Sequence, residues 1–154
     1  MAKRKINARD IIFEVSDGAV SPAWLPVKGL TGVNVNPGEN EESVETTDFD
    51  SQGAYEQEIL QRGASLELEG FLLKDDTTGA QDPGQARVEE MGGEDALGAD
   101  SLGQVRFRHP MDDEWKVWTC TFSLAEQGGG NNDKSSWGAT VTRSGRSSTV
   151  AVTP

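Results

Sequence analysis

The chain has very few of the residues that carry most protein chemistry. Its 154 residues include one cysteine, Cys120, and one histidine, His109. These counts exclude an internal disulfide framework and a zinc site built from several cysteines and histidines. No Gly-x-Ser-x-Gly nucleophile elbow occurs, and Gly128-Gly129-Gly130 lacks the Lys-Ser/Thr pair that completes a phosphate-binding loop. Asp75-Asp76 and Asp112-Asp113-Glu114 offer oxygen ligands for calcium, but neither matches the EF-hand spacing. We therefore expect no catalytic residues, no cofactor and no metal.

Long apolar runs and positive charges are also scarce. No stretch approaches the roughly 20 apolar residues of a transmembrane helix. The basic start leads into Ile6-Asn7-Ala8 rather than the apolar segment of a signal peptide. Lys and Arg number 14 against 26 Asp and Glu, which gives a net charge of −12. Because duplex DNA is held by cations that neutralise its phosphates, tight DNA binding is not expected. These features predict a soluble chain with no membrane contact.

The charges that are present are segregated along the chain. The segment 39–58 holds eight carboxylates and no Lys or Arg, whereas cations cluster near the two ends, at Lys3, Arg4, Lys5 and Arg9 and at Lys134, Arg143 and Arg146. Patches of opposite sign at separate places suit head-to-tail self-association. The simpler interpretation is that these are solvated faces and tails.

Apolar residues make up 34% of the chain and glycine reaches 18 residues, which favours a β architecture with many turns. In the segment 64–73, Leu66 and Leu68 share one face while Glu67 and Glu69 share the other, as the two-residue period of a half-buried strand requires. Similar patterns predict strands at 10–15, 23–28, 29–36, 43–49, 102–109, 115–124, 136–143 and 147–152.

The segment 29–73 reads as two long strands joined by a polar tip, residues 50–63. Its runs Thr46-Thr47-Asp48-Phe49-Asp50-Ser51, Gly53, Glu56-Gln57-Glu58-Ile59, Arg62-Gly63 and Leu66-Glu67-Leu68-Glu69-Gly70 resemble the central hairpin of the tail tube proteins, or major tail proteins, of long-tailed bacteriophages. The passage 99–108 resembles that family's step from helix to next strand. The resemblance covers roughly residues 25–145.

This resemblance implies a mainly β (α+β) fold: an antiparallel β-sandwich or barrel with one flanking α-helix and a long protruding hairpin. It implies one tail-tube domain over 1–154, with a basic arm at 1–8, the central hairpin unit at 29–73, the helix at 82–97 and C-terminal strands over 102–152. Asp82 suits the helix N-cap, Pro83 the first helical position, and Gln85 a capping-box-like spacing. Gly92-Gly93 would end the helix near Met91 on local grounds. We adopt the longer helix that the family carries.

The function implied by the resemblance is that of a structural virion protein, assembled in the host cytoplasm into stacked hexameric rings that form the hollow phage tail. Its expected partners are further copies of itself, the tape measure protein, the tail terminator and the distal tail proteins, with DNA only in transit. The strands around Val44 and Leu66, with those at Val105 and Val117, would line the tube. Candidate lumen residues are Glu67, Glu69 and Glu45. Candidate contacts between rings are Asp50, Gln52, Tyr55, Glu56, Glu58 and Arg62. Candidate basic contacts between subunits are Lys3, Arg4, Lys5, Arg143 and Arg146.

Two other functions fit parts of the sequence. Exposed tryptophans on a β-sandwich can bind carbohydrate, and the chain has Trp24, Trp115, Trp118 and Trp137. Three of these lie in strands at core-compatible positions, which favours burial or subunit contact. The other alternative is a related ring-forming tail or head-tail connector protein.

Overall fold

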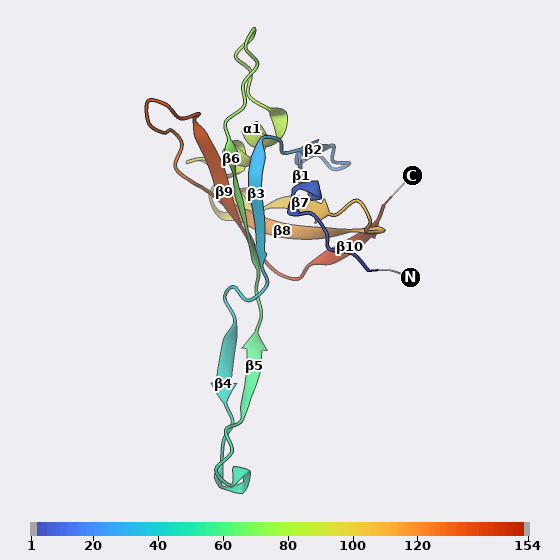
Figure 1. Ribbon diagram of the computed structural model, residues 1–154. Helices are drawn as coiled ribbons and strands as arrows, with labels where there is room; N and C mark the ends of the chain where they lie inside the picture. Colours follow the sequence, from blue (N-terminus) through green and yellow to red (C-terminus); the bar gives the residue numbers. More distant parts are fainter. Residues whose placement is uncertain (1–2, 153–154) are drawn as a thin grey trace.

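The computed structural model describes residues 3–152, so the first two residues of the predicted basic arm 1–8 lie outside the described residues. The chain is mainly β, as predicted, with an eight-stranded antiparallel sheet and, among the described residues, one α-helix (Figure 1). The sheet runs in the order β2 (Trp24–Pro26), β1 (Ile12–Ser16), β7 (Gly103–Arg108), β8 (Glu114–Leu124), β9 (Ser136–Arg143), β6 (Ser65–Phe71) and β3 (Leu30–Asn36), while β10 (Ser148–Ala151) pairs with β8.

The long strand β8 joins the two halves of this sheet. One of its edges pairs with β7, and its other edge pairs with β9 from Cys120 to Leu124 and with β10 from Glu114 to Val117. Between these two pairings the Ser144 amide donates to the Thr119 carbonyl at 2.8 Å. β9 and β10 are therefore one interrupted strand along a single edge of β8, broken by the turn at 144–147.

The core lies on the inward face of this curved sheet. The predicted alternation is confirmed in β7, in β6 from Leu66 to Glu69 and in β8 from Trp118 to Phe122, where each apolar residue is buried and its polar neighbour is not. In the first half of β8 it fails, because Val117 and Trp118 are both buried, and in β9 Gly138 is buried between Trp137 and Ala139. Phe107 and Trp118 meet edge to face with ring centroids 5.1 Å apart. Leu124, which continues the alternation of Trp118, Cys120 and Phe122 in the sequence, is exposed. The largest fully buried apolar side chains are Trp137, Leu66, Leu68, Val15, Val88, Val105 and Val141.

The α-helix is shorter than predicted. α1 spans Pro83–Met91, so the predicted helix over 82–97 is wrong at its C-terminal end. Gly92 caps it with an amide that donates to the Val88 carbonyl at 3.0 Å, and the chain continues through turns to a 3-10 turn at Gly98–Ser101. Each of the paired glycines after Met91 costs roughly 1 kcal/mol relative to alanine in a helix, so local backbone preference ends the helix where the family pattern would continue it.

The start of the helix is built around Gln85. Asp82 is the N-cap as predicted, and its Oδ2 accepts from the Gln85 amide at 3.2 Å. The Gln85 side chain does not close the predicted capping box, because it serves three backbone groups of neighbouring segments instead. Its Oε1 accepts from the Leu73 amide at 3.1 Å, and its Nε2 donates to the carbonyls of Lys28 and Phe71, each at 2.8 Å. This fully buried side chain joins α1 to the segment just before β3 and to the end of β6.

The central unit 29–73 differs from the single long hairpin that was predicted. β3 and β6 pair in the main sheet, while β4 (Glu42–Glu45) and β5 (Gln57–Gln61) form a separate two-stranded ribbon. Figure 1 shows this ribbon projecting far from one end of the sheet. The predicted tip at 50–63 therefore contains a strand, and the connection between the ribbon strands is 46–56.

The root of the ribbon is a close crossing of two backbone segments. A Cβ on Gly63 would lie 2.6 Å from the Glu39 carbonyl oxygen, so no larger residue fits there without a shift. Gln61 Nε2 donates to the Asn40 carbonyl at 2.7 Å across the same crossing, and Asn40 adopts a φ of 60°. These contacts define where the ribbon leaves the sheet. At the opposite end of the molecule a second protrusion, closed by the Lys74–Gln81 bridge, rises beside α1 (Figure 1).

Replacing Gln85 with alanine tests its structural role. The Gln85→Ala variant leaves one backbone amide and two backbone carbonyls without their buried partner, so we expect a loss of about 3 kcal/mol in the free energy of unfolding. Urea denaturation followed by tryptophan fluorescence measures this. Gln104→Ala, on an exposed position of β7, is the matched control and should change stability by less than about 0.5 kcal/mol. Equal losses of unfolding free energy in the two variants would contradict this structural role of Gln85.

Candidate interaction surfaces

The outward face of β3, β6, β9 and the second half of β8 is polar and carries no cation. Cross-strand register places Glu67 between Asn34 and Thr140, and Glu69 between Gly32 and Gly138. Both glutamates are exposed. The surrounding outward positions are hydroxyl, amide or glycine residues, with the apolar Phe71 at one end: Asn36, Ser65, Thr121, Ser123, Ser136 and Thr142. Sheet pairing thus creates a continuous hydrophilic surface over four strands, which we call the acidic face.

Glu45 does not belong to the acidic face. It lies on β4, which pairs only with β5, opposite Gln57. The strand around Val44 is consequently not in the same sheet as the strand around Leu66, although the two were expected to line one surface. The structure brings Glu67 and Glu69 together and leaves Glu45 on the ribbon.

The ribbon carries most of the predicted contact residues, all of them beyond the main sheet. Both faces of β4 and β5 are exposed along their whole length. Gln52, Tyr55 and Glu56 lie on the connection at its tip, and Glu58 lies on β5. Asp50 sits in a 3-10 turn, Phe49–Ser51, and Arg62 lies at the root, where it pairs with Glu41 at 3.5 Å.

The tip is a turn held by hydrogen bonds despite its exposure. The Asp48 Oδ1 accepts from the Ser51 amide, and the Ser51 hydroxyl accepts from the Asp48 amide, both at 3.1 Å. This reciprocal capping box fixes the turn between these two residues. Farther along, the Thr47 hydroxyl accepts from the Glu56 amide at 2.8 Å. The turn thereby holds Phe49 with its side chain fully exposed to solvent.

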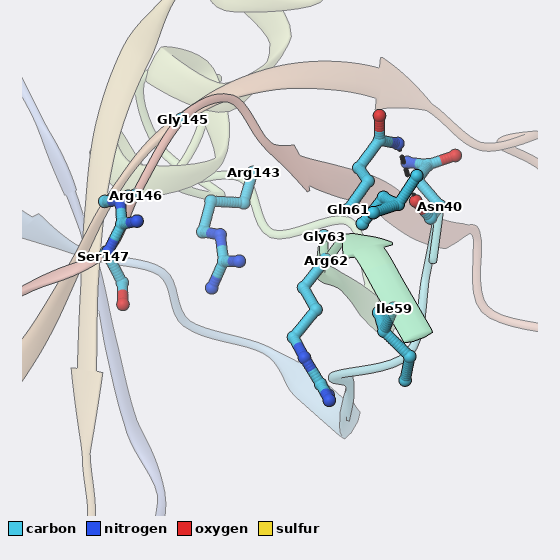
Figure 2. Close-up of a pocket in the computed structure, with 10 residues that line it drawn as sticks. Asn40, Ile59, Gln61, Arg62, Gly63, Arg143, Gly145, Arg146 and Ser147 are labelled. Carbon is cyan, nitrogen blue, oxygen red and sulfur yellow. Dashed lines mark hydrogen bonds between the residues drawn. The ribbon is translucent and has the colours of Figure 1, made fainter. Parts of the chain in front are cut away.

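A basic hollow lies between the root of the ribbon and the 144–147 turn. Figure 2 shows the three arginines that line it: Arg62 just after β5, Arg143 at the end of β9 and Arg146 in the turn. The hollow has a volume of about 840 Å³, and no carboxylate lines it. Arg143 and Arg146 were predicted as contacts between subunits, and the structure places them together with Arg62. The chain as a whole carries a net charge of −12, so a hollow lined by three arginines is a positively charged site on a negatively charged molecule.

The predicted basic arm lies elsewhere. Lys3, Arg4 and Lys5 are exposed, and Arg4 and Lys5 line a separate small hollow beside His109. The structure does not bring them together with Arg143 and Arg146.

The tryptophans are engaged within the chain. Trp115, Trp118 and Trp137 are buried, and the half-buried Trp24 stacks on an arginine. The Arg106 guanidinium lies 4.6 Å from the Trp24 ring centre and 4.1 Å from that of Trp115. Its Nε donates to Glu14 Oε1 at 2.7 Å. The Arg108 guanidinium also lies over Trp115, 4.8 Å from its ring centre. This packing gives the tryptophans a structural role rather than a free carbohydrate platform.

The side chains that could act as nucleophiles or metal ligands are buried or lie apart from one another. Burial raises the pKa of the Cys120 thiol to about 12, so it stays protonated at neutral pH and is a poor nucleophile. Asp75 is exposed, and its pKa is lowered by hydrogen bonds from the Thr78 and Thr77 amides. Within residues 3–152, no three His, Cys, Asp or Glu side chains gather as a metal site. No helix in the same range is long and apolar enough to cross a membrane.

The fold is similar to chains in solved structures of gene transfer agent particles. No family model matches the chain, and no curated protein matches it. Among solved structures it is similar to a chain of the virion of a native gene transfer agent particle, at a TM-score of 0.63 and 19% identity. It is also similar to a chain of the tail of an empty gene transfer agent particle with C6 symmetry, at a TM-score of 0.66 and 22% identity. Each alignment covers 96% of this chain and 100% of the other. The chain therefore shares the fold of these chains of the gene transfer agent virion and tail.

Sequence reasoning missed two groups of residues. Arg108 and Lys116 approach the same end of the sheet as Arg143, and Arg106 builds the stack with Trp24 and Trp115. The alternation of Val105 and Phe107 with Arg106 and Arg108 marked these arginines as outward-facing. Only the register of β7 against β1 and β8 shows which residues they meet.

Substituting Arg106 by lysine tests the stack. The Arg106→Lys variant keeps the charge but loses the planar group between two rings and the two-pronged contact with Glu14, so we expect a loss of about 1–2 kcal/mol in unfolding free energy. Arg62→Lys, in the exposed pair with Glu41, is the control and should change stability by less than about 0.5 kcal/mol. Urea melts of both variants measure the difference. An Arg106→Lys variant as stable as the wild type would show that the stack is energetically neutral.

Proposed function

We propose that this chain is a structural subunit of a phage-like tail, and that copies of it assemble into stacked hexameric rings which form a hollow tube for DNA. The observation that carries the proposal is the similarity, over 96% of the chain, to a subunit of a particle tail with C6 symmetry. The exposed ribbon supports it. A two-stranded ribbon with both faces and both outer edges free has unused backbone donors and acceptors, which further copies can satisfy.

The acidic face is the surface that we assign to the lumen of the tube. Its four strands present Glu67 and Glu69 amid neutral polar groups, with no Lys or Arg among the outward positions. Carboxylates along a channel repel a passing phosphate backbone, and the absence of cations removes the groups that would hold it. A surface of this kind lets DNA slide through the tube without adhering.

The remaining partners follow from the same assignment. The acidic face, turned toward the lumen of the tube, would contact the tape measure protein before DNA enters. The two ends of the stack would contact the tail terminator and the distal tail proteins. The ribbon and the basic hollow are the surfaces that we assign to contacts between copies of the chain.

Electron microscopy of the concentrated protein tests the proposal. We expect rings with six-fold symmetry, stacked into tubes at high concentration or when the proteins that initiate the tail are supplied. Rings that never stack would instead favour a connector protein. A species that stays monomeric under all these conditions would refute the assignment.

Reversing the charge of the acidic face tests the assigned lumen. In assembled Glu67→Lys/Glu69→Lys tubes, we expect short duplex DNA to be retained and protected from nuclease, with retention falling as salt rises. Wild-type tubes should retain none. The control is Glu94→Lys/Asp95→Lys, at exposed positions after α1 and outside the acidic face, where bound DNA should stay sensitive to nuclease. Equal nuclease sensitivity of DNA on both variants would argue against an inward acidic face.

A further inference from the structure

We propose that Phe49, at the tip of the ribbon, is a knob that docks into a cation-rimmed apolar cavity at the ribbon root of a second copy. The inference rests on the proposed function, in which copies stack end to end. It identifies one residue and one cavity as the contact that joins them.

The knob is an apolar side chain that the chain holds out in water. Phe49 has a relative exposure of 103%, although burying a phenylalanine is worth about 1.5–3 kcal/mol. The Asp48–Ser51 capping box fixes the turn that carries it, so little backbone order remains to be lost on binding. Asp50 lies beside it, exposed, and takes no part in the capping bonds. The tip therefore presents a preorganised aromatic ring flanked by negative charge.

The cavity is matched to such a group. It has a volume of about 360 Å³, and its apolar walls are Ile11, just before β1, with Val35 of β3, Phe107 of β7 and Trp118 of β8. Pro37 and Ala64, where the chain enters and leaves the ribbon, also line it. The cavity thus lies at the end of the sheet from which the ribbon emerges.

The rim of this cavity is positively charged and has unused donors. Arg108, Lys116 and Arg143 line it against a single carboxylate, Asp112. Arg108 Nε and Arg143 Nε are buried and have no hydrogen-bond partner among the described residues, and His109 Nδ1 is in the same state. Leaving such donors unpaired costs free energy, which an incoming carboxylate recovers. Arg143 and Ser147 also line the basic hollow, so the cavity and the hollow are neighbours that share these two residues.

The length of the ribbon fits a contact between stacked copies. Residues 37–40 form a turn, so the arm extends from residue 41 to residue 49, about 26 Å at roughly 3.3 Å per residue, which matches the roughly 25 Å spanned by the seven- and eight-residue strands β3, β6 and β9. The tip of one copy can therefore pass along the body of the next and reach the end where that copy's own ribbon begins. Repeated, this head-to-tail contact does not close on itself and extends indefinitely.

Disulfide trapping between two single variants tests the contact directly. Asp50→Cys, which keeps the Phe49 side chain, and Ser147→Cys are purified separately, mixed and oxidised. We expect a cross-linked dimer that forms in the mixture well above the level in either variant alone. The buried native Cys120 is present in every sample. Val20→Cys mixed with Ser147→Cys is the control, because Val20 is fully exposed and lies away from the ribbon. Cross-linking no greater than in this control would overturn the inference.

The energetic test uses assembly by the intact protein. Phe49→Ala should raise the concentration needed for stacking at least tenfold, which corresponds to about 1.4 kcal/mol, and Arg143→Ala should act in the same direction. Val20→Ala should leave it within twofold. Wild-type tubes together with an unaffected Phe49→Ala variant would refute the knob while leaving the tube intact. Cross-linked dimers of the mixed cysteine variants, together with a wild type that never forms rings, would support the knob and refute the tube.

Discussion

The architecture depends on one constraint: a two-stranded ribbon projects from the sheet without a third strand or a core of its own. β4 and β5 pair only with each other, and every residue in them is exposed. Isolated hairpins are marginally stable in water, and open edges invite further strand pairing. The main sheet, in contrast, buries a continuous core from Phe13 to Val141. The chain thus combines a body with its own core and an arm whose outer backbone edges and apolar side chains have no partner among residues 3–152.

Charge is divided in a way that complements this arm. Carboxylates occupy the ribbon and the acidic face, while Arg62, Arg108, Lys116, Arg143 and Arg146 gather around the ribbon root. Exposed ion pairs contribute only about 0–1 kcal/mol each, so these charges select orientation and partner rather than provide most of the binding free energy. In the proposed assembly that energy comes from buried apolar surface and from backbone pairing. The cation-free face remains separate from these contacts because sheet register keeps its residues on the opposite side from the core.

The parts of the fold that could be read from the sequence are those where one face is buried. In β6 and β8 the alternation of Leu66 and Leu68 with glutamates, and of Trp118 and Cys120 with threonines, leaves one possible orientation. β5 has no such pattern, because Ile59 and Leu60 are adjacent and neither face is covered, so it was read as a flexible tip. The helix end was misjudged because a family pattern was preferred to Gly92-Gly93. The basic hollow and cavity could not be predicted, since Arg62, Arg108 and Arg143 meet only through long-range strand pairing. Glu45 was grouped with Glu67 because both follow a strand period, although they belong to different sheets.

The narrow crossing at the ribbon root has a mechanical consequence. Gly63 packs against the Glu39 carbonyl, and three side-chain contacts bridge the two segments: Gln61 to Asn40, Ser65 to Glu39, and the ion pair of Arg62 with Glu41. Within residues 3–152 no further strand braces the crossing, so bending between the arm and the wide sheet is expected there. A filament built from such subunits would absorb curvature at these joints. Each layer would keep its shape while the axis bends, and the bore would stay open.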